Sequence, residues 1–179
     1  HKEYMERVRY ADFNFGRGAV KKGSQTDRGF FYLLLGPPLE RQSYDTYSQV
    51  WPLEVWHYKG DTRYGLPPYF YLMFYQLDGM GEYKLYSPGV DGPERLVIPS
   101  MSNQSLTRRV ALRTLKDVSG EVASAALSYI PGDSSAGSTG SMSSDLMIAS
   151  LRELPNKKFS DAYARTFSYY KDYVETDYS

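Results

Sequence analysis

The residue types best suited to binding or catalysis are concentrated in one stretch, "GSQTDRGFFYLLLGPPLE", which runs from Gly23 to Glu40. Glycines, a Thr-Asp-Arg cluster and a proline pair surround an apolar run there, as they do around phosphate loops and at the ends of buried strands. A phosphate loop needs a lysine directly after its last glycine, and the nearest candidate, "GAVKKGS", lacks it. That candidate also follows a predicted helix, whereas a phosphate loop follows a strand. We therefore predict no nucleotide site here.

The same stretch is interpreted as a structured loop, a buried strand and a stop. Thr26 and Asp27 are expected to hydrogen-bond to neighbouring backbone N–H groups, and Arg28 is expected to pair with a carboxylate. The run "FFYLLL" is short and bounded by glycine on both sides, which favours a buried strand. Gly36, Pro37 and Pro38 then prevent further pairing.

Metal and nucleophile chemistry finds little support in the residue types. The chain has no cysteine, and His57 is its one histidine beyond the first residue. Zinc sites need clustered histidine, cysteine or carboxylate ligands, and H-E-x-x-H is absent. The turn "DGMGE" lacks the repeated ligands of a calcium loop, and no G-x-S-x-G elbow is present. We predict no metal, no cofactor and no catalytic residue.

Carboxylates near the early strands leave one enzymatic alternative open. Paired carboxylates can hydrolyse glycosidic bonds when they are held at a working separation. The sequence places no two of them together, and a half-buried, hydrogen-bonded histidine is the favoured interpretation of His57. A hydrolase in which Asp27 converges with His57 or Glu54 is the alternative to a protein without catalysis. The carboxylates in this region are Asp27, Asp45, Glu54 and Asp61.

The abundance of tyrosine indicates either a sheet with one wetted face or an aromatic binding surface. The chain has 18 tyrosines against 8 phenylalanines, and a tyrosine combines an apolar ring with a polar hydroxyl. Packing is the favoured interpretation, because tyrosine is a good strand former. The candidate binding surface for a peptide or glycan consists of Trp51, Trp56, His57, Tyr58, Tyr69 and Tyr71.

Length and charge exclude several classes of protein. The 179 residues are about the size of one domain, which can bury a core without disulfides. The 21 basic and 21 acidic residues balance, so the basic excess typical of nucleic-acid binding is missing. No apolar run approaches the roughly 18 residues of a membrane span. The chain opens "HKEYMERVRY", and we expect an internal piece of a longer protein whose partners are proteins or other modules of the same chain.

Hydrophobic periodicity predicts a helix followed by a sheet in the first half of the chain. Residues 2–15 carry an apolar stripe at helical spacing, formed by Tyr4, Val8, Ala11 and Phe15. "PLEVWHYK" alternates as a strand, and "PPYFYLMFYQL" is apolar on both faces, which is typical of a central strand. "DGMG" is a hairpin turn, "EYKLYS" its returning strand and "ERLVIP" one more short strand.

The second half is predicted to be mostly helical. "SLTRRVALRTLKDV" has helical spacing with Ser105 as N-cap, and "DLMIASLREL" and "SDAYARTFSYYKDY" are short helices. "EVASAALSYIP" alternates and favours a strand. The class is therefore α+β: an N-terminal helix, an antiparallel sheet of about four to six strands, and C-terminal helices packed on it. We predict one domain over residues 1–173, with residues 174–179 starting a following module.

These motifs resemble a bacterial family, the GWxTD domain, named after a Gly-Trp-x-Thr-Asp motif. "GSQTDRG" stands where the family has Gly-Trp-x-Thr-Asp-Arg-Gly, with Ser24 in place of the tryptophan. The segments "RYADFNF", "FYLLLGPP", "LEVWHY", "DGMGEYKLY" and "KFSDAYARTFSYYKDYVETDYS" are similar to family segments in the same order. The residues expected to carry the motif or to shape the fold around it are Gly23, Thr26, Asp27, Arg28, Gly29, Gly36 and Pro37.

The resemblance implies a domain of an exported envelope protein, periplasmic or extracellular, without an established activity. Because no catalytic motif is present, we expect a non-enzymatic binding or scaffolding module of a larger exported bacterial protein. The alternative is a carboxylate-dependent hydrolase acting on an envelope or extracellular polymer.

Overall fold

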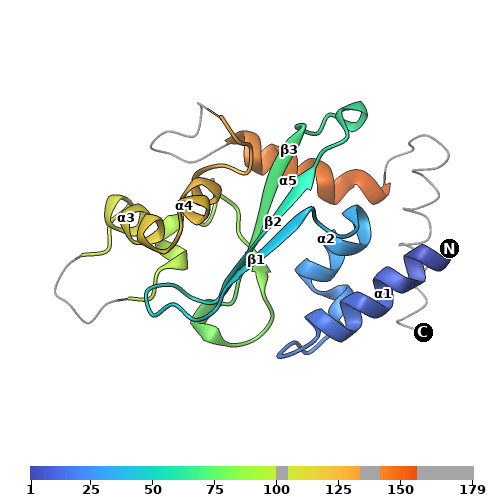
Figure 1. Cartoon of the computed structure of the whole chain (residues 1–179), viewed down its shortest axis with the longest axis horizontal. Helices are drawn as coiled ribbons and strands as arrows, with labels where there is room; N and C mark the ends of the chain where they lie inside the picture. The colour runs from blue at the N-terminus through green and yellow to red at the C-terminus, as the bar shows by residue number, and fades with distance from the viewer. Residues whose placement is uncertain (100–104, 134–141, 157–179) are drawn as a thin grey trace.

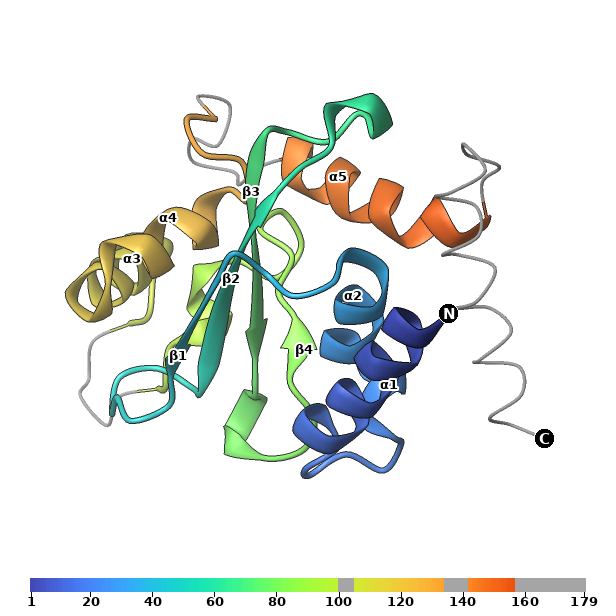
Figure 2. The same ribbon diagram turned by 45° about the vertical axis from the view of Figure 1, so that its right-hand side comes forward.

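A four-stranded antiparallel sheet with the strand order β1-β2-β3-β4 separates two pairs of helices. The computed structural model describes residues 1–99, 105–133 and 142–156. Helices α1 (Lys2–Phe15) and α2 (Asp27–Leu35) lie on one side of the sheet, and α3 (Arg108–Val118) and α4 (Gly120–Leu127) on the other (Figure 1). The rotated view in Figure 2 shows the same arrangement. The predicted α+β class, with an N-terminal helix, an antiparallel sheet and later helices, is confirmed.

Three of the four strands, β2, β3 and β4, lie in segments that the sequence predicted as strands. Strands β2 (Leu53–Lys59) and β3 (Tyr69–Tyr75) pair along their whole length, and β4 (Lys84–Leu85) returns beside the end of β3. Because β3 lies between two strands and has helices over both faces, it is the central strand that its apolar sequence indicated. The first strand, β1 (Glu40–Tyr44), lies in the polar segment before "PLEVWHYK", for which the sequence patterns predicted no strand.

The predicted stripe of α1 is confirmed, and it docks the helix against α2. Its buried residues are Tyr4, Val8, Ala11 and Phe15, and Phe13 on the outer face is 89% exposed. The ring of Phe15 lies 5.7 Å from the ring of Tyr32 in α2 and 5.6 Å from that of Trp56 in β2. The helix therefore covers one face of the sheet through its C-terminal end.

The prediction of a strand over "FFYLLL" is wrong, because this run belongs to α2. The helix begins at Asp27, three residues before the run, so it is longer than the apolar letters suggest. Thr26 caps its start and Gly36, at φ +79°, follows its end. The run is apolar all round because α1, the sheet and the later helix α5 (Met142–Glu153) enclose it. Arg152 of α5 lies over the rings of Phe30 and Phe31.

Two further predictions of strands are corrected. "EVASAAL" forms the helix α4, which Ser119 caps by accepting a hydrogen bond from the N–H of Glu121. Its small residues let it pack closely, and Ala125 and Ala126 are fully buried. "ERLVIP" forms a 3₁₀ turn over Pro93–Leu96, with a single bridge from Val97 to Val50 in place of a strand.

The remaining helices follow the predictions in outline. Helix α3 is capped by Thr107, two residues after the predicted Ser105. Helix α5 is confirmed and ends just before Pro155. The predicted helix over 160–173 and the boundary at residue 174 lie outside the described residues. The other 3₁₀ turns are Gly23–Gln25, Thr62–Tyr64, Leu77–Gly79 and Leu154–Asn156.

Candidate functional site

The Thr-Asp-Arg motif builds the start of α2. The Thr26 hydroxyl accepts a hydrogen bond from the Gly29 N–H at 3.2 Å and donates one to the Gly23 carbonyl at 2.7 Å. One oxygen of Asp27 accepts the N–H of Leu85 at 2.8 Å, so this carboxylate joins the helix to β4 rather than closing its own turn. An acidic residue in the first turn also complements the helix dipole. Thr26 and Asp27 therefore serve the fold.

At Gly23 and Gly29 the main chain packs directly against another main-chain segment. A Cβ atom on Gly23 would lie 2.0 Å from the carbonyl oxygen of Ala11 in α1, and one on Gly29 would lie 2.0 Å from the carbonyl oxygen of Gly23. No side chain can shift to relieve such contacts, because the opposing atoms belong to the main chain. Ser24, which stands in place of the family's tryptophan, is buried, and its N–H donates to Asp12.

Arg28 reaches a buried carboxylate on the face of the sheet that α2 covers. Its Nη1 donates to Glu54 Oε1 at 3.1 Å, and both side chains are 7% exposed. Arg41 of β1 donates to the other carboxylate oxygen at 2.8 Å, and the Ser43 hydroxyl and the Trp56 indole N–H also donate to this carboxylate. The guanidinium of Arg28 also lies over the Tyr83 ring at 4.0 Å. We call this group the Glu54 cluster.

The Glu54 cluster is unsuited to acid–base catalysis. Burial alone would raise the pKa of Glu54, but hydrogen bonds and charge from Arg41 and Arg28 outweigh it and hold the pKa below its ordinary value. A catalytic acid needs a raised pKa and access to substrate, whereas Glu54 stays ionised and buried. This carboxylate is therefore an anchor for two guanidinium groups.

His57 lies on the opposite face of β2 from Glu54, because successive side chains of a strand alternate. Its Nε2 is hydrogen-bonded to the carboxylate of Glu121 in α4, while Arg28 contacts Glu54 beneath α2. Asp27, Arg28 and His57 therefore do not line one cleft. Asp27 therefore does not converge with His57, and the carboxylates of Asp27 and Glu54 have separate partners, the N–H of Leu85 and the two guanidinium groups.

Four residues of the predicted binding surface line one cavity of about 410 Å³, where β2 ends and β3 begins. On the α4 side of the sheet, Glu40, His57 and Tyr71 are direct cross-strand neighbours in β1, β2 and β3. The ring of Tyr71 stands edge-on to the imidazole at 4.7 Å. We call this the aromatic cavity; its lining is Leu39, Glu40, His57, Tyr58, Tyr69, Phe70, Tyr71 and Pro131.

The aromatic cavity has a fixed floor and an open rim. His57 is held by Glu121, and burial together with the charge of Glu121 raises the pKa of Tyr71, so its hydroxyl stays protonated. Tyr69 is 58% exposed and Leu39 is 67% exposed. A second cavity of about 330 Å³ adjoins and shares Tyr71 and Pro131. This surface offers apolar rings, one carboxylate and a phenol to a ligand.

The two tryptophans of the predicted surface lie elsewhere. Trp56 is fully buried, and its ring centroid lies 4.7 Å from that of Phe74 in the core between the sheet and α2. Trp51 precedes β2, and its backbone N–H donates to the carbonyl of Leu96. The sequence missed Glu40, Glu121 and Pro131, because only the register of β1 and the position of α4 bring them to His57.

The part of the chain that the structure describes contains no group of three metal-ligating side chains. Within the same residues, no helix combines the length and apolar character needed to cross a membrane.

Comparisons of the chain with protein-family models, with curated proteins and with solved structures find no match. The resemblance to the GWxTD domain therefore rests on the quoted residues and stays a prediction.

Proposed function

We propose that the chain is a non-enzymatic binding module of a larger exported bacterial protein, and that the aromatic cavity takes a proline-containing segment of a partner protein. The gathering of His57, Tyr58, Tyr69 and Tyr71 around one cavity is the observation that carries the proposal. The bacterial and exported context comes from the resemblance alone. The location would be periplasmic or extracellular.

The chemistry of the rim favours a peptide with a compact apolar group. Grooves lined by aromatic rings take proline-rich segments, whose preformed extended helix loses little entropy on binding. Tyr69 offers an exposed ring face beside Pro131, and Tyr71 offers a hydroxyl to a peptide carbonyl. Glu40 has one carboxylate oxygen bound by Gln42 and a second that can accept a peptide N–H.

Among the residues that the structure describes, no contact favours the hydrolase alternative. Glu54 is buried between two arginines, Asp27 accepts a backbone N–H, and Asp61 is bound by the guanidinium and the N–H of Arg63. Each of these carboxylates has a partner that an enzyme would need to displace. The proposal therefore assigns them to the fold.

Replacing Tyr69 by alanine is expected to weaken peptide binding at least about tenfold, since its exposed ring is the face that the proline would cover and a tyrosine that anchors a partner contributes about 2 kcal/mol or more. The measurement is binding of the 179-residue chain to an array of proline-containing dodecapeptides and, in parallel, to an array of oligosaccharides. Binding to proline peptides that is lost on substitution of their proline by alanine supports the proposal.

Tyr47→Ala is the matched control, because Tyr47 is 42% exposed and does not line the cavity. It should leave binding unchanged. Binding to oligosaccharides alone, binding to neither array, or equal losses in the two variants would contradict the proposal.

A further inference from the structure

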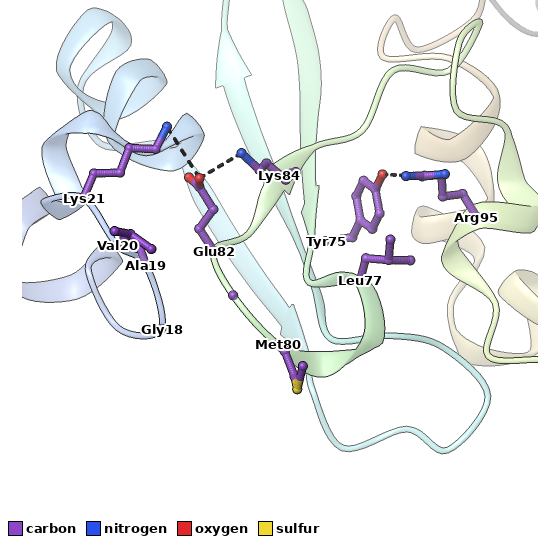
Figure 3. Close-up of a pocket in the computed structure, with 11 residues that line it drawn as sticks. Gly18, Ala19, Val20, Lys21, Tyr75, Leu77, Met80, Glu82, Lys84 and Arg95 are labelled. Carbon is purple, nitrogen blue, oxygen red and sulfur yellow. Dashed lines mark hydrogen bonds and ion pairs between the residues drawn. The ribbon is translucent and has the colours of Figure 1, made fainter.

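A larger cavity of about 580 Å³ lies at the end of the sheet next to the loop after α1. Four separate segments line it: the loop around Gly18, the end of β3, the turn and strand that lead into β4, and the turn that carries Arg95 (Figure 3). None of its residues lines the aromatic cavity. We call it the basic pocket.

Two loops that touch through their backbones shape the basic pocket. Gly18 has φ +79°, and a Cβ atom there would lie 3.1 Å from the carbonyl oxygen of Gly81. This close approach places Val20 and Lys21 opposite Met80 and Glu82, as Figure 3 shows. The opposing walls therefore come from segments about sixty residues apart in the chain, held together by main-chain packing.

Lys21 and Lys84 converge on Glu82 at one end of the basic pocket. Their ammonium groups lie 3.5 Å and 2.8 Å from the same carboxylate oxygen. An ammonium group has three donors, so each lysine keeps N–H groups for a further acceptor. The other oxygen of Glu82 is buried without a hydrogen-bond partner among the described residues. The cluster is therefore not saturated by its own contacts.

Arg95 supplies a third cation at the other end. Its Nε donates to the Tyr75 hydroxyl at 2.9 Å and lies 3.9 Å from Asp91, while its side chain is 50% exposed. Within residues 1–99, 105–133 and 142–156, its two terminal nitrogens have no hydrogen-bond partner. These nitrogens form a fork that fits a carboxylate with two parallel hydrogen bonds. Three cations and one carboxylate thus line the pocket.

Apolar side chains of the same lining are left in solvent. Val20 is fully exposed, Met80 is 75% exposed and Leu77 is 37% exposed. Methionine is a flexible side chain that adapts to varied partners, and methionine and arginine are enriched in protein interfaces. The pocket therefore presents apolar surface next to positive charge, and this combination matches an acidic side chain with an apolar side chain beside it.

We propose that the basic pocket is a second binding site, which takes an acidic side chain of a partner protein together with an adjacent apolar side chain. The acidic group pairs with the terminal nitrogens of Arg95, and the ammonium groups of Lys21 and Lys84 add positive charge at the other end of the pocket. The apolar group covers Leu77 and Met80. In the free protein Glu82 holds the two lysines, and its negative charge partly cancels theirs and repels the incoming carboxylate.

The test sorts a displayed library of random decapeptides on the Tyr69→Ala variant, in which the aromatic cavity is disabled, at low salt. Enriched peptides should carry Asp or Glu within two positions of a large apolar residue. Their affinity should fall at least about tenfold in Arg95→Gln, since a hydrogen bond to a charged group is lost. It should fall less in Lys84→Gln, which removes only a positive charge from the other end of the pocket. It should also fall with added salt.

The Glu82→Gln variant is expected to bind the acidic peptides more tightly, whereas Arg95→Gln binds them more weakly. The neutral amide removes a negative charge that repels the acidic group of the peptide, and it no longer neutralises the two lysines. The affinity for acidic peptides should therefore rise roughly threefold. A variant that only damages the fold cannot produce this gain. Arg63→Gln is the control for net charge, because Arg63 is exposed and lies outside the pocket.

Selection of peptides without acidic residues would overturn the assignment. Acidic peptides that bind Arg95→Gln and Arg63→Gln equally well would overturn it too, as would weaker binding by Glu82→Gln. The result is separable from that of the aromatic cavity, because the bait already lacks Tyr69.

Discussion

Replacing Glu54 by glutamine is expected to lower the free energy of unfolding by about 3–5 kcal/mol. The substitution keeps the shape of the side chain and removes the one carboxylate that Arg28 and Arg41 share. A guanidinium keeps its proton in proteins, so Arg28, with a side chain only 7% exposed, would stay charged without an anion beside it. The measurement is the urea midpoint of unfolding at neutral pH.

Asp61→Asn is the control for the Glu54 substitution. It removes a carboxylate that also binds an arginine, but the side chain of Arg63 is 78% exposed and water replaces the lost contact. The midpoint of this variant should equal that of the wild type. A Glu54→Gln variant as stable as the wild type would show that the cluster is not a structural anchor.

The contribution of Glu54 should depend on pH with a defined sign. Burial opposes ionisation, but the hydrogen bonds and charges of Arg41 and Arg28 lower the pKa of Glu54 below the ordinary value of 4.5. A lowered folded pKa gives stability that is fully present above pH 4.5 and is lost as the pH falls through the folded value. The difference in midpoint between wild type and Glu54→Gln should therefore shrink below pH 4.5. A difference that grows in acid would contradict the assignment.

The fold could be predicted where one local pattern determined the element. The stripe of α1 and the alternation of β2 and β3 are local, and these elements lie where the patterns indicated. The α2 run was misassigned because an element enclosed on all sides loses its periodicity, so that a helix and a buried strand look alike. Thr26 was the signal for the helix: it caps the run four residues before Phe30.

The edge strand β1 and the partners of His57 could not be predicted from the sequence. β1 is polar and largely exposed, so it carries none of the alternation by which a half-buried strand is recognised. The aromatic residues around His57 could be named as candidates, but the sequence did not show that His57 faces α4 while Trp56 and Tyr58 share the other face of β2, where their rings lie 6.3 Å apart. The partners Glu40 and Glu121 come from segments whose register and docking are tertiary properties.

Replacing Gly29 by alanine should destabilise the protein by about 3 kcal/mol or more, although helix propensity alone favours alanine by about 1 kcal/mol at a helical position. The added Cβ would lie 2.0 Å from the Gly23 carbonyl oxygen and 2.7 Å from backbone atoms of Ser24. Relief requires α2 to move away from the 3₁₀ turn at Gly23–Gln25, which would also stretch the Thr26 cap and the contact of Asp27 with β4.

Gly120→Ala is the matched control, since Gly120 begins α4 and a Cβ there would meet nothing within 4 Å. It should leave stability unchanged or raise it by up to about 1 kcal/mol, because alanine reduces the freedom of the unfolded chain. Both variants are compared by urea unfolding. Opposite signs for the same substitution would show that close backbone packing, rather than local propensity, selects glycine in the motif. Equal and small effects would mean that the motif glycine is kept for another reason, and the account of the motif as a packing device would be wrong.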